Sequence, residues 1–417
     1  MNILLLEHRS RHEPDAGTPI HALAGLAEHS FLHVDPWTLI AQRGQRGAEE
    51  FVRSYIATNA IDLLLLNPGY GFDFPLEYLA CDLACYKVLL AVDDDNYFDA
   101  SYRYYAQAFD LVLSTNPLVE RYMVYGFPVR YWGGGFPTRE KLRDVQGESV
   151  QPYDVTFIGS LIDKPNRSNY VAALEKAGFK VDLFGVGTSH GYLADDQLPS
   201  LFRASKINLN FTGISERTIL DRRLGINSRI RNPKGRCQHI GLAGGFILSE
   251  YAPGIERVFS IEKEIAVFHD ASDLVEKVAY YLQRPLVRQR LAQSAHERAH
   301  REYAAPEYWR RFLADIERRL GAKVTPMAPI VSADFRRSYG AYRLQYFVLF
   351  VFTGRWTSAW AEFVSFLSNR GWRQVYASAW HARQGLAWAS HHSGAAAAVR
   401  AALRRLRNRF QAGERKR

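Results

Sequence analysis

The sequence has few cysteines and lacks any long hydrophobic run. Its 417 residues include three cysteines, Cys81, Cys85 and Cys237, whose spacing matches no metal-binding repeat. An odd number is a poor basis for a disulfide framework, so we expect a reducing compartment. No apolar run reaches the roughly 18 residues of a spanning helix, and Met1 leads into the apolar run 3–6 without a basic leader. We therefore expect a cytoplasmic protein with neither a secretory signal nor a membrane span.

Acidic residues are scarce in one part of the chain. The net charge is +10, but residues 333–417 alone hold 15 Lys or Arg against three acids, which gives +12 there and −2 elsewhere. Five of the eight tryptophans lie in the same part: Trp356, Trp360, Trp372, Trp380 and Trp388. Arginines interleaved with aromatics can bind nucleic acid. The rest of the chain is slightly negative, however, so we expect no nucleic-acid partner.

The remaining sequence is typical of folded α/β domains. Hydrophobic residues make up 47% and charged residues 23%, and the length exceeds what one core usually organises. Short apolar runs alternate with helical patterns, which predicts parallel sheets built from βαβ units. The predicted strands are 2–6, 31–34, 61–66, 87–92 and 110–114, followed by 155–158, 181–184, 207–211, 246–248 and 265–268.

These runs fall into two groups that define the expected domains. Residues 1–136 form the first domain, the polar stretch 137–152 is a linker, and residues 153–321 form the second domain. Residues 322–417 form a basic, tryptophan-rich helical tail, which we expect to be a separate unit. Two such domains face each other across a cleft, and ligands bind at the carboxyl ends of parallel strands. The helix 306–320 closes the fold, with a crossing back to the first domain as one possibility.

The segment after residue 232 holds the residues best suited to bind an anion. Lys234 and Arg236 are two cations that could contact a diphosphate, and the pair Gly244 and Gly245 before a predicted strand permits close backbone approach. An alternative interpretation is a helix that ends in glycine and carries solvated basic residues. The pattern alone does not choose between them.

This segment resembles the C-terminal domain of "group 1" glycosyltransferases, and within them the spore-maturation-protein group. The likeness covers roughly residues 150 to 315, where several spaced motifs occur in order. These motifs are Phe157-Ile-Gly159-Ser160, Ser205 to Phe211, Lys234-x-Arg236, Gly244-Gly245-Phe-Ile-Leu-x-Glu250-Tyr251, Glu264-Ile265, Asp273-Leu274-x-x-Lys277 and Tyr280-Tyr281-Leu282, with Arg298 and Tyr303 beyond them.

The resemblance implies a GT-B fold, in which two Rossmann-like domains face a cleft and the second domain holds a sugar nucleotide. It places Gly159, Ser160 and Asn210 in the nucleotide site, the first two beside the diphosphate. It also implies that Lys234 and Arg236 neutralise the departing diphosphate. We therefore expect a hexosyl or related glycosyl transfer that needs neither a cofactor nor a metal, with a nucleotide-diphosphate sugar as donor substrate.

One position departs from the family pattern. Relatives place a glutamate, suited to the ribose hydroxyls, where this sequence has His239. Histidine can still hydrogen bond, and Glu250 is a second carboxylate near the same strand that could serve the sugar or the ribose. The alternative for His239 is a position on an outer helix face. This departure keeps open a second function, a GT-B protein that binds or epimerises a sugar nucleotide without transferring sugar.

The general base is expected in the first domain. Asp93 and Asp94 follow a predicted strand, so either could take the proton of an acceptor hydroxyl. Adjacent acids also cap helices, which is the alternative for this run and above all for Asp95. His12, in the polar loop after the first strand, is a third candidate for the base.

The tail allows three interpretations. Apolar residues at helical spacing with a basic face are typical of a helix lying in an anionic membrane surface. The same aromatics could instead pack on the two domains or form an oligomer contact. The first interpretation predicts a peripheral protein at the inner face of the membrane, acting on a glycan, lipid-linked or other cell-envelope acceptor.

Overall fold

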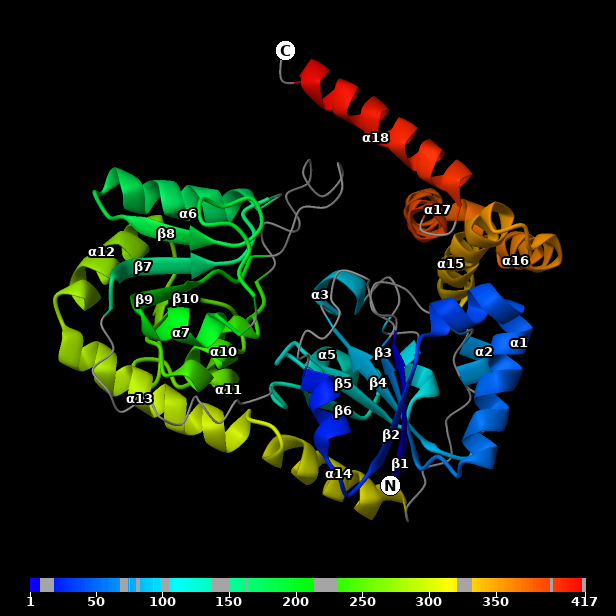
Figure 1. The fold of residues 1–417 in the computed structure, drawn as a ribbon, viewed down its shortest axis with the longest axis horizontal. Helices are drawn as coiled ribbons and strands as arrows, with labels where there is room; N and C mark the ends of the chain where they lie inside the picture. Colours follow the sequence, from blue (N-terminus) through cyan, green and yellow to red (C-terminus); the bar gives the residue numbers. More distant parts are fainter. Residues whose placement is uncertain are drawn as a thin grey trace.

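The structure, a computed structural model of the full chain, consists of two α/β domains and a group of C-terminal helices that packs on the first domain (Figure 1). It describes residues 1–7, 19–67, 74, 76–79, 83–92, 94–98, 102, 105–136, 151–162, 164–194, 196–213, 231–320, 332–390 and 393–414. Two parallel sheets with flanking helices confirm the predicted fold class, including the helical C-terminal region.

The first domain contains a six-stranded parallel sheet of order β2-β1-β3-β4-β5-β6. Its strands are β1 (Asn2–Glu7), β2 (Ser30–Val34), β3 (Leu63–Asn67), β4 (Tyr86–Ala91), β5 (Leu111–Ser114) and β6 (Val129–Tyr131). Its helices are η1 (Pro19–Gly25), α1 (Pro36–Thr58), α2 (Leu76–Leu79), α3 (Asp94–Tyr97), η3 (Ala106–Ala108) and α5 (Glu120–Met123). All five strands predicted for this domain are present, and only the three-residue β6 was not predicted.

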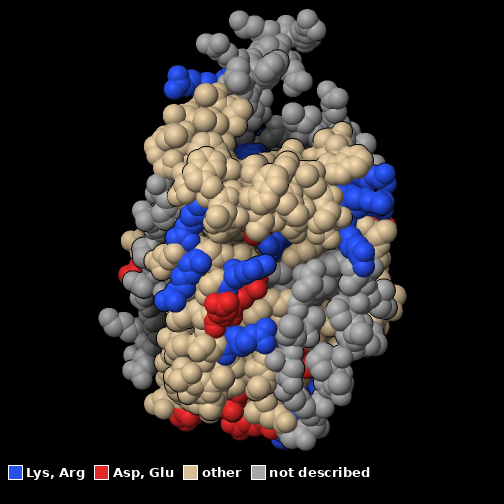
Figure 2. Space-filling model, turned by 90° about the vertical axis from the view of Figure 1, so that its right-hand side faces the viewer, with Lys and Arg blue, Asp and Glu red and all other residues tan. Residues whose placement is uncertain are grey.

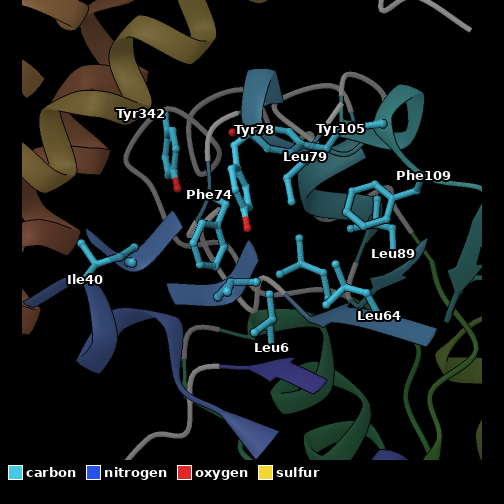
Figure 3. Close-up of a cluster of buried hydrophobic side chains, with 14 of the residues drawn as sticks. Leu6, Ile40, Leu64, Phe74, Tyr78, Leu79, Leu89, Tyr105, Phe109 and Tyr342 are labelled. Carbon is cyan, nitrogen blue, oxygen red and sulfur yellow. The ribbon is translucent and has the colours of Figure 1, made fainter. Parts of the chain in front are cut away.

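Both faces of this sheet are buried, as the uninterrupted apolar runs require. Leu4 and Leu6 point into a core shared with α1, α2 and η3, whereas Ile3 and Leu5 point into a second core on the other face. Figure 3 shows the first of these cores. The alternation follows from the two-residue repeat of a β-strand.

The second domain contains a five-stranded parallel sheet of order β11-β10-β9-β7-β8. Its strands are β7 (Tyr153–Ile158), β8 (Val181–Phe184), β9 (Ser205–Asn210), β10 (Ile247–Glu250) and β11 (Ala266–Phe268). Its helices are α6 (Pro165–Lys176), α7 (Leu198–Arg203), α10 (Arg236–Ala243), α11 (Ile255–Val258), α12 (Ala271–Leu282) and α13 (Pro285–Glu302). The five predicted strands are again confirmed.

Helix α14 (Glu307–Leu320) returns the chain from the second domain to the first. Trp309 at its start is fully buried in the second core of the first domain, where Phe312, Leu313 and Ile316 follow it along the same face. The indole Nε1 of Trp309 donates a hydrogen bond to the Gly135 carbonyl oxygen at 3.3 Å. The expected crossing helix is therefore confirmed, and it covers the face of the sheet opposite α1.

The C-terminal region is helical, as predicted, but it is not separate from the first domain. It comprises α15 (Ala333–Phe352), α16 (Trp356–Ser368), η5 (Gly371–Arg373), α17 (Val375–Ala389) and α18 (Gly394–Glu414). Tyr342, Tyr346 and Phe350 of α15 are buried in the first core, and Figure 3 shows Tyr342 beside Phe74 and Tyr78. Within the described residues, none of these helices combines the length and hydropathy that crossing a bilayer requires.

One polar contact joins two helices of this region, and another joins the region to the first domain. Arg343 of α15 and Glu362 of α16 form a buried, two-pronged ion pair, with Nε–Oε2 and Nη2–Oε1 distances of 2.6 and 2.8 Å. A buried ion pair adds little net stability, because the cost of desolvating both charges offsets their attraction. Removing one partner, however, would leave an uncompensated buried charge. Arg355, between α15 and α16, donates a hydrogen bond to the Ile40 carbonyl oxygen of α1 at 3.3 Å. The tail is therefore bound to the first domain by apolar and polar contacts.

We expect Phe350→Ala to lower the free energy of unfolding by about 3–5 kcal/mol, because it opens a cavity in the shared core. Urea denaturation followed by circular dichroism measures this change. The matched control is Tyr376→Ala, which truncates an aromatic side chain that is 76% exposed in the same helical region and should change stability by less than about 0.5 kcal/mol. Equal effects of the two substitutions would show that α15 does not belong to the core.

Candidate functional site

The carboxyl ends of β7, β9 and β10 bring together residues far apart in the sequence. These strands are neighbours in the second sheet, and their ends lead to Gly159, Asn210 and Glu250. Helix α10 begins beside them with Arg236, whose Nη1 donates a hydrogen bond to Asn210 Oδ1 at 3.1 Å. The amide of Asn210 in turn donates to Ser249 Oγ at 2.9 Å. Four of the predicted site residues, Gly159, Asn210, Arg236 and Glu250, thus lie at one edge of the sheet.

The absence of a side chain at Gly159 makes room for the guanidinium of Arg236. A Cβ atom at position 159 would lie 2.5 Å from Arg236 Nη2, and the backbone there has φ of +148°, which strongly favours glycine. The guanidinium also lies over the ring of Phe157, 4.9 Å from its centroid. Burial lowers the pKa of Arg236 to about 10, so the group keeps its positive charge at neutral pH.

A second arginine at this edge was not predicted from the sequence. Arg167, in the first turn of α6, is 4% exposed and donates hydrogen bonds to the carbonyl oxygens of Ser160 and Gly213, at 3.0 and 3.4 Å. Its guanidinium lies 5.5 Å from the centroid of the Phe157 ring that also contacts Arg236. Burial and the nearby positive charge of Arg236 lower the pKa of Arg167 to about 9. One buried and one half-buried cation therefore contact the same aromatic ring.

Glu250 holds the surrounding loops rather than standing free. Its carboxylate accepts hydrogen bonds from the backbone N–H groups of Thr212 and Gly213, at 2.8 and 3.2 Å, and from the Tyr170 hydroxyl at 3.1 Å. It also forms an ion pair with Arg231, with an Nε–Oε1 distance of 2.6 Å. These contacts order the chain that follows β9, so a direct contact of Glu250 with sugar or ribose stays a prediction.

Ser160, Lys234 and His239 lie around this centre in different ways. Ser160 Oγ accepts a hydrogen bond from the backbone N–H of Ile162 at 3.1 Å, and Lys234 directly precedes α10 with a partly exposed side chain. His239 is exposed on α10, where its ring meets Phe136 edge-on at 4.5 Å between centroids. Although part of the residue is exposed, desolvation of its ring against Phe136 and the positive charge of Arg236 lower the pKa of His239.

The structure does not bring Gly244 and Gly245 into this cluster. They lie between α10 and β10, which is the amino end of the strand, whereas the cluster gathers at the carboxyl ends. Gly244 ends α10 in a left-handed conformation, with φ of +77°. A Cβ at Gly245 would lie 2.8 Å from Asn208 Nδ2 and 2.9 Å from the Phe202 carbonyl oxygen. Their role here is helix termination and close packing, which corrects the predicted nucleotide contact.

The carboxylate candidates of the first domain have different surroundings. Asp94 is fully buried, accepts hydrogen bonds from Ser114 Oγ and the Tyr122 hydroxyl at 2.7 and 2.9 Å, and pairs with Arg121 at 2.6 Å. Its position at the start of α3 fits the alternative of a helix-terminal acid. Within the described residues, the Asp94 carboxylate is therefore enclosed and already paired, which suits a structural role better than that of a base.

The two other base candidates, Asp93 and His12, lie outside the described residues. The proposed roles of both stay predictions.

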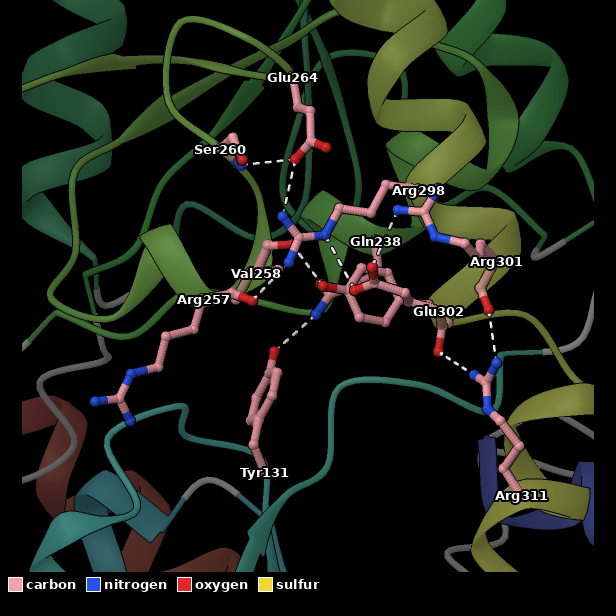
Figure 4. Close-up of polar contacts among 11 residues, drawn as sticks. Tyr131, Gln238, Arg257, Val258, Ser260, Glu264, Arg298, Arg301, Glu302 and Arg311 are labelled. Carbon is pink, nitrogen blue, oxygen red and sulfur yellow. Dashed lines mark hydrogen bonds and ion pairs between the residues drawn. The ribbon is translucent and has the colours of Figure 1, made fainter.

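Contacts between the domains fix the position of the cluster relative to the first domain. The Gln238 amide of α10 hydrogen bonds with the Tyr131 hydroxyl of β6 at 2.9 Å, as Figure 4 shows. Arg257 of α11 donates to the Pro117 carbonyl oxygen at 2.8 Å and pairs with Glu120 of α5. Helices α10 and α11 of the second domain are therefore tied to β6 and to the segment that follows β5.

Chemically, the cluster offers a place for an anion. Arg167, Arg231 and Arg236 bring three positive charges near one carboxylate, Glu250, which is already paired. Backbone at the end of β7 lies beside them, and backbone N–H groups next to such cations are typical of phosphate sites. Cations held this close repel one another, so a bound diphosphate would relieve the repulsion.

Comparisons with known proteins agree with this geometry. Residues 167–314 match the family model described as "Glycosyl transferase-like". HepE of Anabaena, solved in complex with UDP and glucose, has a TM-score of 0.54 at 12% identity, over 76% of this chain and all of that chain. A glycosyltransferase of Rickettsia africae gives 0.51 at 11% identity, over 77% and 99% of the two chains, and sucrose-phosphate synthase of Thermosynechococcus elongatus gives 0.50 at 11%, over 77% and 99%. No curated protein sequence matches.

The two facing α/β domains and the similarity to these solved structures show a GT-B fold. The match of residues 167–314 to the glycosyl transferase-like model supports the resemblance to group 1-like glycosyltransferases in the second domain. Its narrower likeness to the spore-maturation-protein group stays a prediction.

The burial of Asp94 predicts a pH dependence of stability. Desolvation, partly offset by Arg121, raises the pKa of Asp94 from 3.8 to about 6 in the folded protein. A raised pKa means that the stability contributed by the protonated form is complete below about pH 4 and is lost as the pH rises through about 6. Relative to Asp94→Asn, the wild type should thus lose up to about 3 kcal/mol between these limits.

Urea unfolding at a series of pH values measures this difference. Asp154→Asn, which alters an exposed carboxylate of the second domain, is the control and should follow the wild-type curve. Parallel curves for the wild type and Asp94→Asn would contradict the assigned environment of Asp94.

Proposed function

We propose that the protein transfers a glycosyl group from a nucleoside diphosphate sugar to an acceptor hydroxyl. The observation that carries this proposal is the convergence of Arg167 and Arg236 on the Phe157 ring, beside the side-chain-free Gly159. This arrangement fits a diphosphate, and HepE, a protein of the same fold, binds UDP. The sugar would extend from the diphosphate toward the first domain.

In this proposal the arginines act on the leaving group. As the bond between the sugar and the phosphate oxygen breaks, the electron pair stays on that oxygen and negative charge develops there. Arg236, with Lys234 beside it, supplies positive charge at this point, and Arg167 holds the loop after β7 in place through Ser160. Fixed charges in a partly desolvated site stabilise such a transition state without reorganisation. Because these cations supply the charge, we propose that the transfer needs no metal.

A residue of the first domain would accept the proton of the acceptor hydroxyl. Asp93 and His12 remain candidates for this role, whereas the enclosed Asp94 is better suited to hold α3 and β5 together through Ser114. The acceptor oxygen attacks the anomeric carbon, and the released products are the glycosylated acceptor and the nucleoside diphosphate. The acceptor enters from the side of the first domain.

We further propose that the acceptor belongs to the cell envelope, as a glycan or a lipid-linked sugar, and that the enzyme works at the inner face of the membrane. The support for this location is the +12 charge of residues 333–417 together with their five tryptophans. Cationic and aromatic side chains are the two kinds that favour an anionic lipid surface.

Nucleoside diphosphate release from a panel of sugar nucleotides tests the proposal. Arg236→Ala and Lys234→Ala should each lower kcat/KM about 100- to 1000-fold, the cost of a lost donor to a developing charge, about 3–4 kcal/mol. The matched control is Arg284→Ala, which removes an exposed arginine at the distant end of α12 and should leave the rate unchanged. Wild-type rates in both site variants would remove the diphosphate assignment.

The same panel separates transfer from binding alone. A transferase releases diphosphate faster when acceptor is added, while a binding protein or an epimerase shows no acceptor dependence. Sugar-nucleotide binding without acceptor-dependent release would favour the second function.

His239→Glu tests whether this position faces the ribose. If it does, the substitution restores the carboxylate of relatives and should keep or raise nucleotide affinity, since a carboxylate accepts hydrogen bonds from two hydroxyls. Isothermal titration with nucleoside diphosphate measures this, and His239→Ala is the matched control. Unchanged affinity in both variants would place His239 outside the nucleotide contact.

A further inference from the structure

Helix α16 reverses the usual arrangement of a surface helix. Its only charged residue, Glu362, is 1% exposed and points inward to Arg343, so the charge lies inside. A solvated helix normally shows its charged residues to water and its apolar residues to the core. The outward side of α16 instead carries large apolar side chains three or four residues apart: Trp356, Trp360, Val364 and Leu367, of which both tryptophans are 67% exposed.

The apolar surface continues beyond α16. Trp372 of η5 is 52% exposed, and Val375 and Tyr376 at the start of α17 are 67% and 76% exposed. We call these three residues and the four of α16 the tryptophan face. Contiguous apolar surface of this kind marks a site that contacts something other than water.

Positive charge borders the tryptophan face. Arg370 and Arg373 are exposed between α16 and α17, and the Arg373 guanidinium lies 5.1 Å from the centroid of the Trp372 ring. Figure 2, which views the molecule from the side of α1 and α16, shows an uncharged area in its upper part with blue side chains at its margins. In the sequence, no aspartate or glutamate occurs between Glu362 and Glu414. The chain segment that carries most of the face therefore contributes only positive charge to its border.

A hollow opens beside the start of α16. It is lined at the α15–α16 junction by Phe352, Thr353 and Arg355, on α1 by Thr38, Ala41 and Gln42, and by Ser393. Hydroxyl groups beside a guanidinium are suited to an anionic head group, because they donate hydrogen bonds to phosphate oxygens. This hollow adds a polar site next to the apolar face.

We propose that the tryptophan face inserts into the interface of an anionic lipid surface, with the bordering arginines on the phosphate groups. Indole rings favour the depth where lipid chains meet head groups, and arginines there gain from the negative surface potential. A second copy of this chain fits less well, because a two-fold contact would bring two basic borders together. The inference deepens the membrane location proposed above and rests on it.

This orientation would serve the proposed acceptor. Helix α15 packs on Phe74, Tyr78 and Tyr105, which belong to the segments that follow β3 and β4. Those segments lie at the carboxyl end of the first sheet, where ligands of parallel sheets bind. A membrane under the tryptophan face would therefore lie next to the side of the first domain from which a lipid-linked acceptor enters.

Flotation of the full-length protein with vesicles tests the inference. Vesicles of phosphatidylcholine with about 30% phosphatidylglycerol should bind the wild type, and vesicles without the anionic lipid or in high salt should not. Trp356→Ser combined with Trp360→Ser should weaken binding at least about tenfold, since two large side chains leave the interface. Arg370→Gln combined with Arg373→Gln should weaken binding to anionic vesicles as well.

The matched control combines Val124→Ser with Leu286→Ser, which removes two apolar side chains that are 82% and 78% exposed away from the tail. This variant should bind vesicles like the wild type. Unchanged binding of the tryptophan variant, or a wild-type dimer that the tryptophan variant converts to a monomer without any vesicle binding, would overturn the inference. Diphosphate release in solution without vesicles is measured alongside, so failure of the transferase proposal is detected separately.

Discussion

A parallel sheet must be covered on both faces, and the first domain meets this requirement only with help from the end of the chain. Among the described residues, α1 supplies much of the core on one face of this sheet and α14 much of the core on the other. Helix α15 then extends the core on the α1 side. The crossing helix and the tail are consequences of this one constraint.

At the carboxyl edge of the second sheet, the position of the charged Arg236 depends on close packing and on a hydrogen bond. Gly159 leaves the space that Arg236 occupies, and Asn210 orients that arginine, so the cation is held in place before any ligand binds. Glu250 serves the same end indirectly by ordering the backbone after β9. Because its charged groups are already in position, such a site needs no reorganisation when a ligand binds. This preorganisation would suit the stabilisation of a departing diphosphate.

Much of this could be predicted from the sequence, because buried parallel strands are apolar throughout and ligands bind at their carboxyl ends. Arg236 was proposed because it is one of two closely spaced cations in a segment that resembles a known family. Arg167 was not, since an arginine in the first turn of a helix looks the same in sequence whether it points to water or under a loop. The pair Gly244 and Gly245 was misplaced because a glycine motif does not show which end of a strand it serves. The burial of Tyr346 and Phe350 was also out of reach, since composition separates the tail that packing joins to the first domain.

The return of α14 and α15 to the first domain also bears on how the chain is made. A growing chain emerges from the ribosome from its amino end, and domains usually fold in that order. Here the first sheet lacks one of its covering layers until Trp309 and its neighbours have been synthesised. The second domain, by contrast, has all its strands and its own helices by Glu302. The second domain can therefore complete its fold before the first domain does. The first domain then completes its core beside a second domain that is already folded.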